Sequence, residues 1–253
     1  FGFPDNYALL FLLTGVTTGL SIATFAAIRE PIEPVQRRQM ALGDYLASGL
    51  RLLREDVNYR RLCAVQFLWS FSMMAAPFYV PYALSDLGIG TVYVGIFVSV
   101  MQFSSILSNL LWAYIGQRKG NQALLVYGTY FLGLAAAVPL LAIYVPDRSL
   151  ALGWTGGTVL NLRVLFFALT FVFYGFAHSG MYTGRTAYVL DLAPPDRRPP
   201  YTSFMNMFML PQGLMLILAG RLIAWISYRR MFLITLVFVP LSVWMTRRLE
   251  DVR

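Results

Sequence analysis

The sequence predicts an all-α polytopic membrane protein with seven transmembrane helices. Of its 253 residues, 58% are hydrophobic and only 13% are charged, and the mean hydropathy of +0.61 is too high for an ordinary soluble domain. The apolar residues form seven stretches, most of them close to the roughly 20 residues that an α-helix needs to cross a ~30 Å hydrocarbon layer. These are Tyr7–Ile28, Leu62–Leu84, Val92–Ile115, Gln122–Val145, Val164–Leu190, Thr202–Ile226 and Met231–Met245. The last is the shortest, and Tyr228 and Trp244 flank it as interfacial aromatic residues would.

Basic residues set the expected orientation. Fourteen of the 20 Lys and Arg residues lie in alternate connections between the spans, five lie in the opposite connections, and Arg185 lies within a span. The side richer in Lys and Arg is expected to be cytoplasmic. The chain is therefore predicted to start outside and to end in the cytoplasm, as an integral protein of the plasma membrane (the inner membrane in a bacterium).

A long polar connection, 29–61, separates one span from the other six. Within it, Leu46, Leu50, Leu53 and Val57 recur at helical spacing, which predicts an amphipathic helix on the membrane surface with its arginines among anionic headgroups. A binding site for a partner protein is the alternative. The predicted organisation is a transmembrane helix at 1–28, a cytoplasmic linker at 29–61, a six-helix bundle at 62–246 and a cytoplasmic tail at 247–253.

Several functions are disfavoured by what the sequence lacks. The net charge of +8 is not gathered into one basic patch, so no nucleic-acid partner is expected. One cysteine, Cys63, and one histidine, His178, leave too few ligands for a zinc site. The sequence has no phosphate-binding Gly-x-x-x-x-Gly-Lys-Ser/Thr loop, no nucleophile–base set and no paired intramembrane carboxylates. We therefore expect neither an enzyme nor a cofactor.

Two short motifs occupy predicted cytoplasmic connections. After the third span the chain reads Ala113-Tyr114-Ile115-Gly116-Gln117-Arg118-Lys119-Gly120, and after the fifth it reads Asp191-Leu192-Ala193-Pro194-Pro195-Asp196-Arg197-Arg198. The first resembles a loop signature of the major facilitator superfamily, in which a Gly is followed by Asp, Arg and Gly four, five and seven residues later. The second resembles the acidic-x-x-Pro-x-x-x-Arg signature of the same family. The matching residues are Ala113, Gln117, Arg118, Gly120, Asp191, Pro194 and Arg198.

The resemblance extends over the whole chain and implies a transporter. The seven spans resemble the sixth to twelfth helices of a twelve-helix protein: one helix of an N-terminal half that is otherwise missing, then a complete C-terminal half. The start at Phe1 rather than Met fits a fragment. Such transporters move a small solute by alternating access between two halves that rock around a central site. The expected partners are the lipid bilayer, a small-molecule substrate and the missing half, and a coupling proton or ion is left open.

The same resemblance gives the two motifs a role as a cytoplasmic gate. In the family, ion pairs between these loops hold the cytoplasmic side shut in the outward-facing state. By that resemblance Arg118 meets Asp191, and Gln117 lies near Arg198. The chain departs from the family at Gln117, where an Asp is usual, so this gate is expected to be weaker because an amide cannot form the ion pair. Orientation-setting loop charges are the alternative interpretation.

Polar residues within spans predict the transport cavity. In the family, the first and fourth helices of each half line it, and these correspond to Leu62–Leu84 and Val164–Leu190. The candidates are Gln66, Trp69, Ser70, Tyr174, His178, Tyr182 and Arg185. Helix packing is the alternative for about half of them, and snorkelling to the interface is the alternative for Arg185. No Asp or Glu lies mid-span, which disfavours a cationic substrate bound by this half.

Other polar and small residues suggest packing and bends. Gly180 and Gly184 form a small-x-x-x-small pair, which favours close helix contact. Pro211 predicts a kink in the sixth span. A seven-helix membrane receptor or sensor is the main rival to the transporter, although a retinal type is disfavoured because the sole lysine, Lys119, lies in a connection. The sequence leaves the substrate, the direction of transport and the oligomeric state open.

Overall fold

The computed structural model describes residues 5–28, 42–151 and 159–250, which belong to two compact units, 1–41 and 42–253. The first unit contains one helix, α1 (Asp5–Ala26). The hydroxyls of Thr14, Thr17 and Thr24 donate hydrogen bonds to carbonyls four residues earlier in α1. These three hydroxyls are thus satisfied within the helix, as an apolar environment requires.

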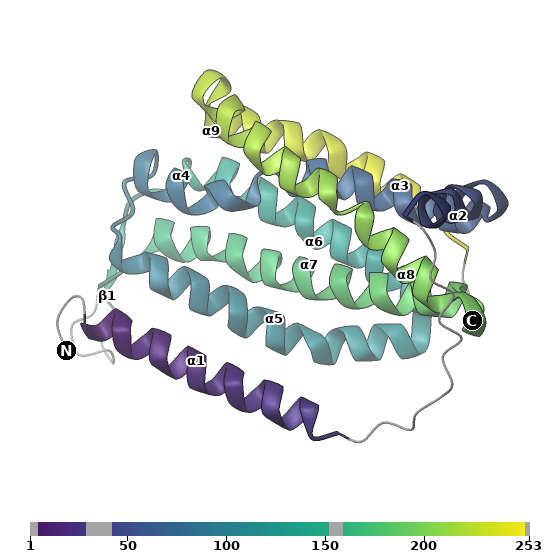
Figure 1. Ribbon diagram of the computed structural model, residues 1–253. Coiled ribbons are helices and arrows are strands. Elements are labelled where there is room, and N and C mark those ends of the chain that lie inside the picture. Colours follow the sequence, from purple (N-terminus) through teal and green to yellow (C-terminus); the bar gives the residue numbers. More distant parts are fainter. Residues whose placement is uncertain (1–4, 29–41, 152–158, 251–253) are drawn as a thin grey trace. The chain divides into compact units, whose positions relative to one another are not determined.

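The second unit is a helical bundle with one short pair of strands (Figure 1). The two strands, Ser149–Ala151 and Val159–Asn161, pair in antiparallel register with Ser149 opposite Asn161, and the sequence did not predict them. Its elements are α2 (Leu42–Glu55), α3 (Val57–Ser72), η1 (Ala76–Phe78), α4 (Tyr79–Ser85), α5 (Val92–Lys119), α6 (Asn121–Ala142), β1 (Ser149–Ala151), β2 (Val159–Asn161), α7 (Leu162–Leu192), η2 (Pro195–Arg197), α8 (Arg198–Met207) and α9 (Leu210–Thr246).

Six helical runs in the described part of the chain are long and apolar enough to cross a membrane. The last, Pro195–Thr246, has 52 residues. At 1.5 Å per residue it would measure roughly 78 Å, more than twice the ~30 Å hydrocarbon layer. Ser227 divides it, because its backbone angles of φ 68° and ψ 158° are not helical, and the ribbon folds back on itself in α9. This run is therefore long enough to contain the last two predicted spans, one on each side of Ser227.

Prolines fix the other breaks. The predicted span Leu62–Leu84 is divided into α3, η1 and α4, with Pro77 inside the 3-10 turn because proline lacks the N–H that a continuing helix would use. Pro211 lies in the first turn of α9, where that missing N–H costs nothing. The bend predicted at Pro211 is thus a helix start, with the break just before it at Phe208 and Met209.

Glycines on α7 allow it to approach α5 and α6 closely. A Cβ at Gly180 would lie 2.6 Å from the Trp112 ring, and one at Gly184 would lie 2.8 Å from the Cβ of Leu124. Gly175 is still tighter, since its Cβ would lie 2.5 Å from the carbonyl oxygen of Met101. Gly180 and Gly184 thus allow close helix packing, as predicted. The close contact continues along α7 to Gly175, which was not predicted.

The amphipathic segment forms α2, and of the described side chains on the predicted apolar face only Leu53 packs against the core. Leu52 is buried, and Gly49 lies against the Phe204 ring of α8. Leu50 and Val57, which the periodicity placed on the apolar face, are exposed, and the side chain of Leu46 lies outside the described residues. The prediction missed the contact with α8 because Gly49 carries no hydrophobic signal.

A closed ring of hydrogen bonds joins the chain's C-terminal segment to α3 and α7, and we call it the Asn58–Tyr188–Glu250 ring. The Asn58 amide donates to the Tyr188 hydroxyl (2.6 Å), which donates to the Glu250 carbonyl (2.8 Å), and the Glu250 N–H donates back to the Asn58 side-chain oxygen (3.0 Å). The Gln122 amide of α6 also donates to the Leu249 carbonyl (2.5 Å). Residues 249–250 are therefore held by three helices.

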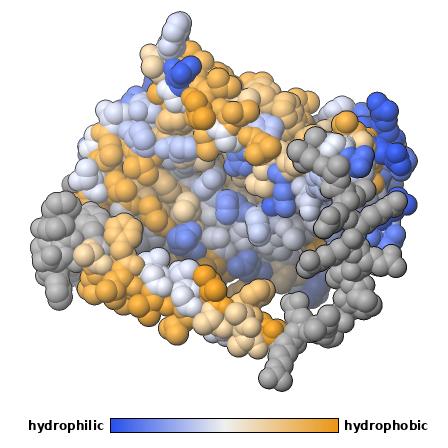
Figure 2. All heavy atoms as spheres, viewed as in Figure 1, coloured by the Kyte–Doolittle hydropathy of each residue, from blue (hydrophilic) through white to orange (hydrophobic). Residues whose placement is uncertain are grey.

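The surface of the bundle is largely apolar. Large hydrophobic side chains such as Phe103, Leu110 and Val237 are exposed along α5 and α9, and Figure 2 shows hydrophobic residues over much of one face, with hydrophilic residues gathered where α2 lies. Soluble monomers rarely expose apolar patches of this extent. Such a surface suits lipid.

Candidate functional site

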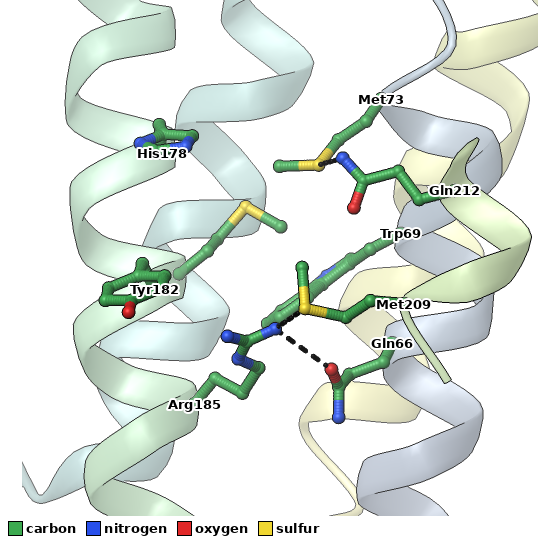
Figure 3. A pocket seen from close by; sticks show the side chains of 9 residues that line it. Gln66, Trp69, Met73, His178, Tyr182, Arg185, Met209 and Gln212 are labelled. Atoms are coloured by element: carbon green, nitrogen blue, oxygen red, sulfur yellow. Dashed lines mark hydrogen bonds between the residues drawn. The ribbon is translucent and has the colours of Figure 1, made fainter. Parts of the chain in front are cut away.

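A pocket of about 70 Å³ opens between α3, α7 and the start of α9 (Figure 3). Five of the seven predicted cavity residues line it: Gln66, Trp69, His178, Tyr182 and Arg185. The other lining residues are Met73, Met181, Met209 and Gln212.

Helical spacing brings the lining side chains together. Gln66 and Trp69 on α3 and Met73, which caps the end of that helix, follow one another at three and four residues, so they share one face. Arg185 reaches toward that face from α7 on the opposite wall, and His178 lies two helical turns earlier on α7 (Figure 3). The third wall comes from Met209, which precedes α9, and from Gln212 in the first turn of α9. The pocket thus depends on the break between α8 and α9.

Arg185 is the central charge of the site. It is only 7% exposed, and its Nη1 donates to the Gln66 Oε1 (3.3 Å) and also contacts the Met209 sulfur. Its guanidinium lies 5.3 Å from the centre of the Tyr182 ring, within range of a cation–π interaction. The salt bridges among the described residues are all made by other arginines. The positive charge is therefore buried without a carboxylate from this part of the protein.

Two buried donors around Arg185 have no hydrogen-bond partner among the described residues. These are the Nε of Arg185 and the Nε2 of Gln66, which is 4% exposed. Buried N–H groups are normally paired, because an unpaired one loses its bonds to water without replacing them. The two residues come from facing helices and line the same pocket, and the two donor atoms themselves are shielded from solvent.

The remaining walls are apolar, and the mouth is aromatic. The Trp69 indole is fixed by its Nε1, which donates to the Thr129 hydroxyl (3.0 Å). Methionine side chains supply much of the rest, and their flexible thioethers adapt to irregular shapes. Tyr182 is 61% exposed and His178 is also exposed, so both lie where the pocket opens.

Two predicted cavity residues lie elsewhere. The Ser70 hydroxyl donates to the Gln66 carbonyl of its own helix (3.2 Å), and the residue is buried outside the pocket. Tyr174 packs in a ring cluster, 6.0 Å from Tyr79 and 6.2 Å from His178 between ring centres. The family resemblance selected the two helices and the periodicity selected a face of each, but neither could distinguish lining from packing positions.

Met209 and Gln212 were not among the predicted site residues. Gln212 donates to the Met73 sulfur at 3.5 Å, which joins α9 to α3 across the pocket. The available signal was the Pro211 break, because irregular backbone within a membrane-spanning region tends to border a cavity.

The gate motif lies at the end of α5 and the end of α7. Gly120 joins α5 to α6 with φ 80° and ψ 171°, a conformation that other residues rarely adopt. The Asp191 carboxylate accepts a hydrogen bond from the Asn121 amide (2.5 Å), and the Arg118 guanidinium lies 4.5 Å from the centre of the Tyr114 ring. Ala113, Gln117 and Arg198 are exposed, and Pro194 follows the end of α7. The Arg118–Asp191 contact stays a prediction.

No protein-family model matches the chain, and no curated protein matches it significantly. The class that the structure defines is a helical protein whose apolar helices are long enough to cross a membrane several times.

Proposed function

We propose that this chain is part of a secondary transporter of the major facilitator type, and that the pocket around Arg185 belongs to its solute-binding site. The position of the pocket is the main support for this proposal. The pocket lies between α3 and α7, which correspond to the first and fourth helices of the six-helix half, the two that line the cavity in this family.

The depth of the pocket also supports transport. Trp69 and Met73 lie near the middle of the run Val57–Ser85, and His178 lies near the middle of Leu162–Leu192. Transporters of this kind bind solute near the bilayer midplane, so that the site can open to either side. A pocket restricted to one end of the bundle would not suit that mechanism.

The proposal includes the parts of the prediction that concern the whole protein. The unit 1–41 supplies one helix of the other half, residues 42–55 lie on the cytoplasmic surface, and the chain ends in the cytoplasm. Alternating access then requires a second half to close the pocket. The partners are lipid and a small solute, and the protein is not an enzyme.

The test is transport by the full-length protein in proteoliposomes. Counterflow of a solute panel should identify a substrate, and His178→Ala at the pocket mouth should reduce its transport while Leu110→Ala, on the exposed apolar surface, should not. Saturable binding without counterflow of any bound solute would instead favour the receptor alternative. Unchanged transport by His178→Ala would remove that residue from the pathway.

A further inference from the structure

The pocket contains a charge that nothing in the described part of the chain neutralises. Arg185 is buried and remains charged under all ordinary conditions. Moving an unpaired charge out of water costs several kcal/mol, so buried arginines normally have an anionic partner. Its contacts here are an amide oxygen, a sulfur and the face of a tyrosine ring. These solvate the guanidinium, but they do not neutralise it.

Arg185 and Gln66 each have one buried donor without a partner among the described residues. Both of Arg185's hydrogen bonds to described residues leave from Nη1, while Nε is unpaired. The Gln66 amide holds Arg185 through its oxygen, and its nitrogen is unpaired. The same Gln66 side chain thus orients the guanidinium and supplies a further donor. A group with several acceptor atoms would satisfy both residues.

The rest of the lining favours a singly charged organic anion. None of the nine lining residues is an Asp or Glu, so the pocket offers a cation no carboxylate. A doubly charged phosphate would need further cations, and Arg185 is the one lysine or arginine in the lining. A carboxylate, by contrast, matches the planar fork of one guanidinium. Trp69, Met181 and Tyr182 then supply apolar and aromatic contacts for an attached carbon skeleton.

We propose that the pocket recognises small organic monocarboxylates, with the carboxylate bound to Arg185 and hydrogen-bonded by Gln66. That these acids are also transported rests on the proposed function, but their binding can be measured separately. The volume of about 70 Å³ suits a carboxylate head, because a single water needs about 10–15 Å³ by the same kind of measure. The remainder of the solute would extend toward the exposed Tyr182 and His178.

The test compares acids with their uncharged amides. Thermal unfolding of the full-length protein in detergent is followed with benzoate and benzamide, phenylacetate and phenylacetamide, and the straight-chain acids and amides of two to ten carbons. We expect at least one acid to raise the unfolding temperature and its amide to have no effect at the same concentration. Equal stabilisation by acid and amide, stabilisation by amines instead, or no response to any acid would each overturn the inference.

Variants at the two donors identify the site. Arg185→Gln should weaken binding of the active acid by about 30-fold or more, as expected when one partner of a buried charged pair is removed. Arg185→Lys retains the charge but loses the fork, so partial binding should remain. Gln66→Leu should weaken binding by roughly 5- to 10-fold, equivalent to the loss of one hydrogen bond, and it provides a second test if Arg185→Gln does not fold. The matched control is Arg163→Gln on the same helix, because Arg163 pairs with Asp147 outside the pocket.

The outcomes separate this inference from the proposed function. Acid-specific binding that depends on Arg185, without counterflow, would support the anion site and contradict the proposed transport function. Counterflow of a neutral or cationic solute would support the transporter and overturn the anion site. Unchanged acid binding in Arg185→Gln would make Arg185 a packing residue, whose charge is neutralised by another part of the protein.

Discussion

Gly175 offers a direct test of the close contact between α7 and the backbone of α5. A Cβ at this position would lie 2.5 Å from the Met101 carbonyl oxygen and 3.0 Å from the Ser105 nitrogen, and both are backbone atoms. Ordinary carbon–oxygen contacts are about 3.3–3.6 Å. Gly175→Ala therefore requires α5 and α7 to move apart by nearly 1 Å, because no flexible side chain can give way instead.

The expected loss of stability follows from this geometry. Overpacking by one methyl group typically costs about 1–3 kcal/mol, and the helix preference of Ala over Gly offsets about 0.5–1 kcal/mol. The net loss should be about 1–2 kcal/mol. For a protein of this size each kcal/mol lowers the unfolding temperature by about 2–4 °C, so Gly175→Ala should unfold about 2–8 °C below the unmodified protein.

The assay is thermal unfolding in detergent, followed by circular dichroism. Gly95→Ala on α5 is the matched control, because nothing lies within 4 Å of a Cβ there, and its unfolding temperature should stay the same or rise slightly. If both variants were as stable as the unmodified protein, the close crossing of α5 and α7 at Gly175 would be wrong. A fall in both would point to the loss of glycine flexibility instead.

Three further predictions concern other parts of the bundle. Gly120→Ala should lower stability by about 1–3 kcal/mol, since its backbone conformation excludes a Cβ, whereas Gly116→Ala should be tolerated because its Cβ would make only ordinary contacts of 3.4 Å or more. Tyr188→Phe removes a hydroxyl that makes two hydrogen bonds and should cost about 1–3 kcal/mol in thermal or denaturant unfolding; an unchanged midpoint would contradict the ring described above. Gln117→Asp in the full-length protein should shift it toward the outward-facing state, and accessibility labelling that detects no shift would refute the gate prediction.

The sequence predicted the helices well because their ends are marked chemically. Val92 begins both the predicted span and α5, and α5 continues past the predicted end into polar sequence to Lys119, whereas α1 and α6 end a few residues before the predicted bounds. The turn between the last two spans was predicted from Tyr228, Arg229 and Arg230, which are polar or interfacial. In the structure the turn consists of a single non-helical residue, Ser227, with helix on both sides. This was not predictable, because serine has no marked preference for a positive φ.

The candidate site was predicted in part, for a related reason. The family resemblance named the two helices and the periodicity named a face of each; the structure has Gln66 and Arg185 hydrogen-bonded across the pocket. Periodicity does not say which members of a face a neighbouring helix covers, and Tyr174 is covered by Tyr79. Met209 was missed because its position depends on the break before α9, a tertiary feature rather than a periodic one.

The ring formed by Asn58, Tyr188 and Glu250 has a consequence for the order of folding. Asn58 and Glu250 are 192 residues apart in the sequence, yet each completes the other's hydrogen bonding. Contacts of such long range form late, because a long loop of chain must first be closed. During synthesis the beginning of α3 would wait until residue 250 has emerged, with its buried amide supported only by Tyr188. A segment made 192 residues later thus completes the hydrogen bonding at the start of α3.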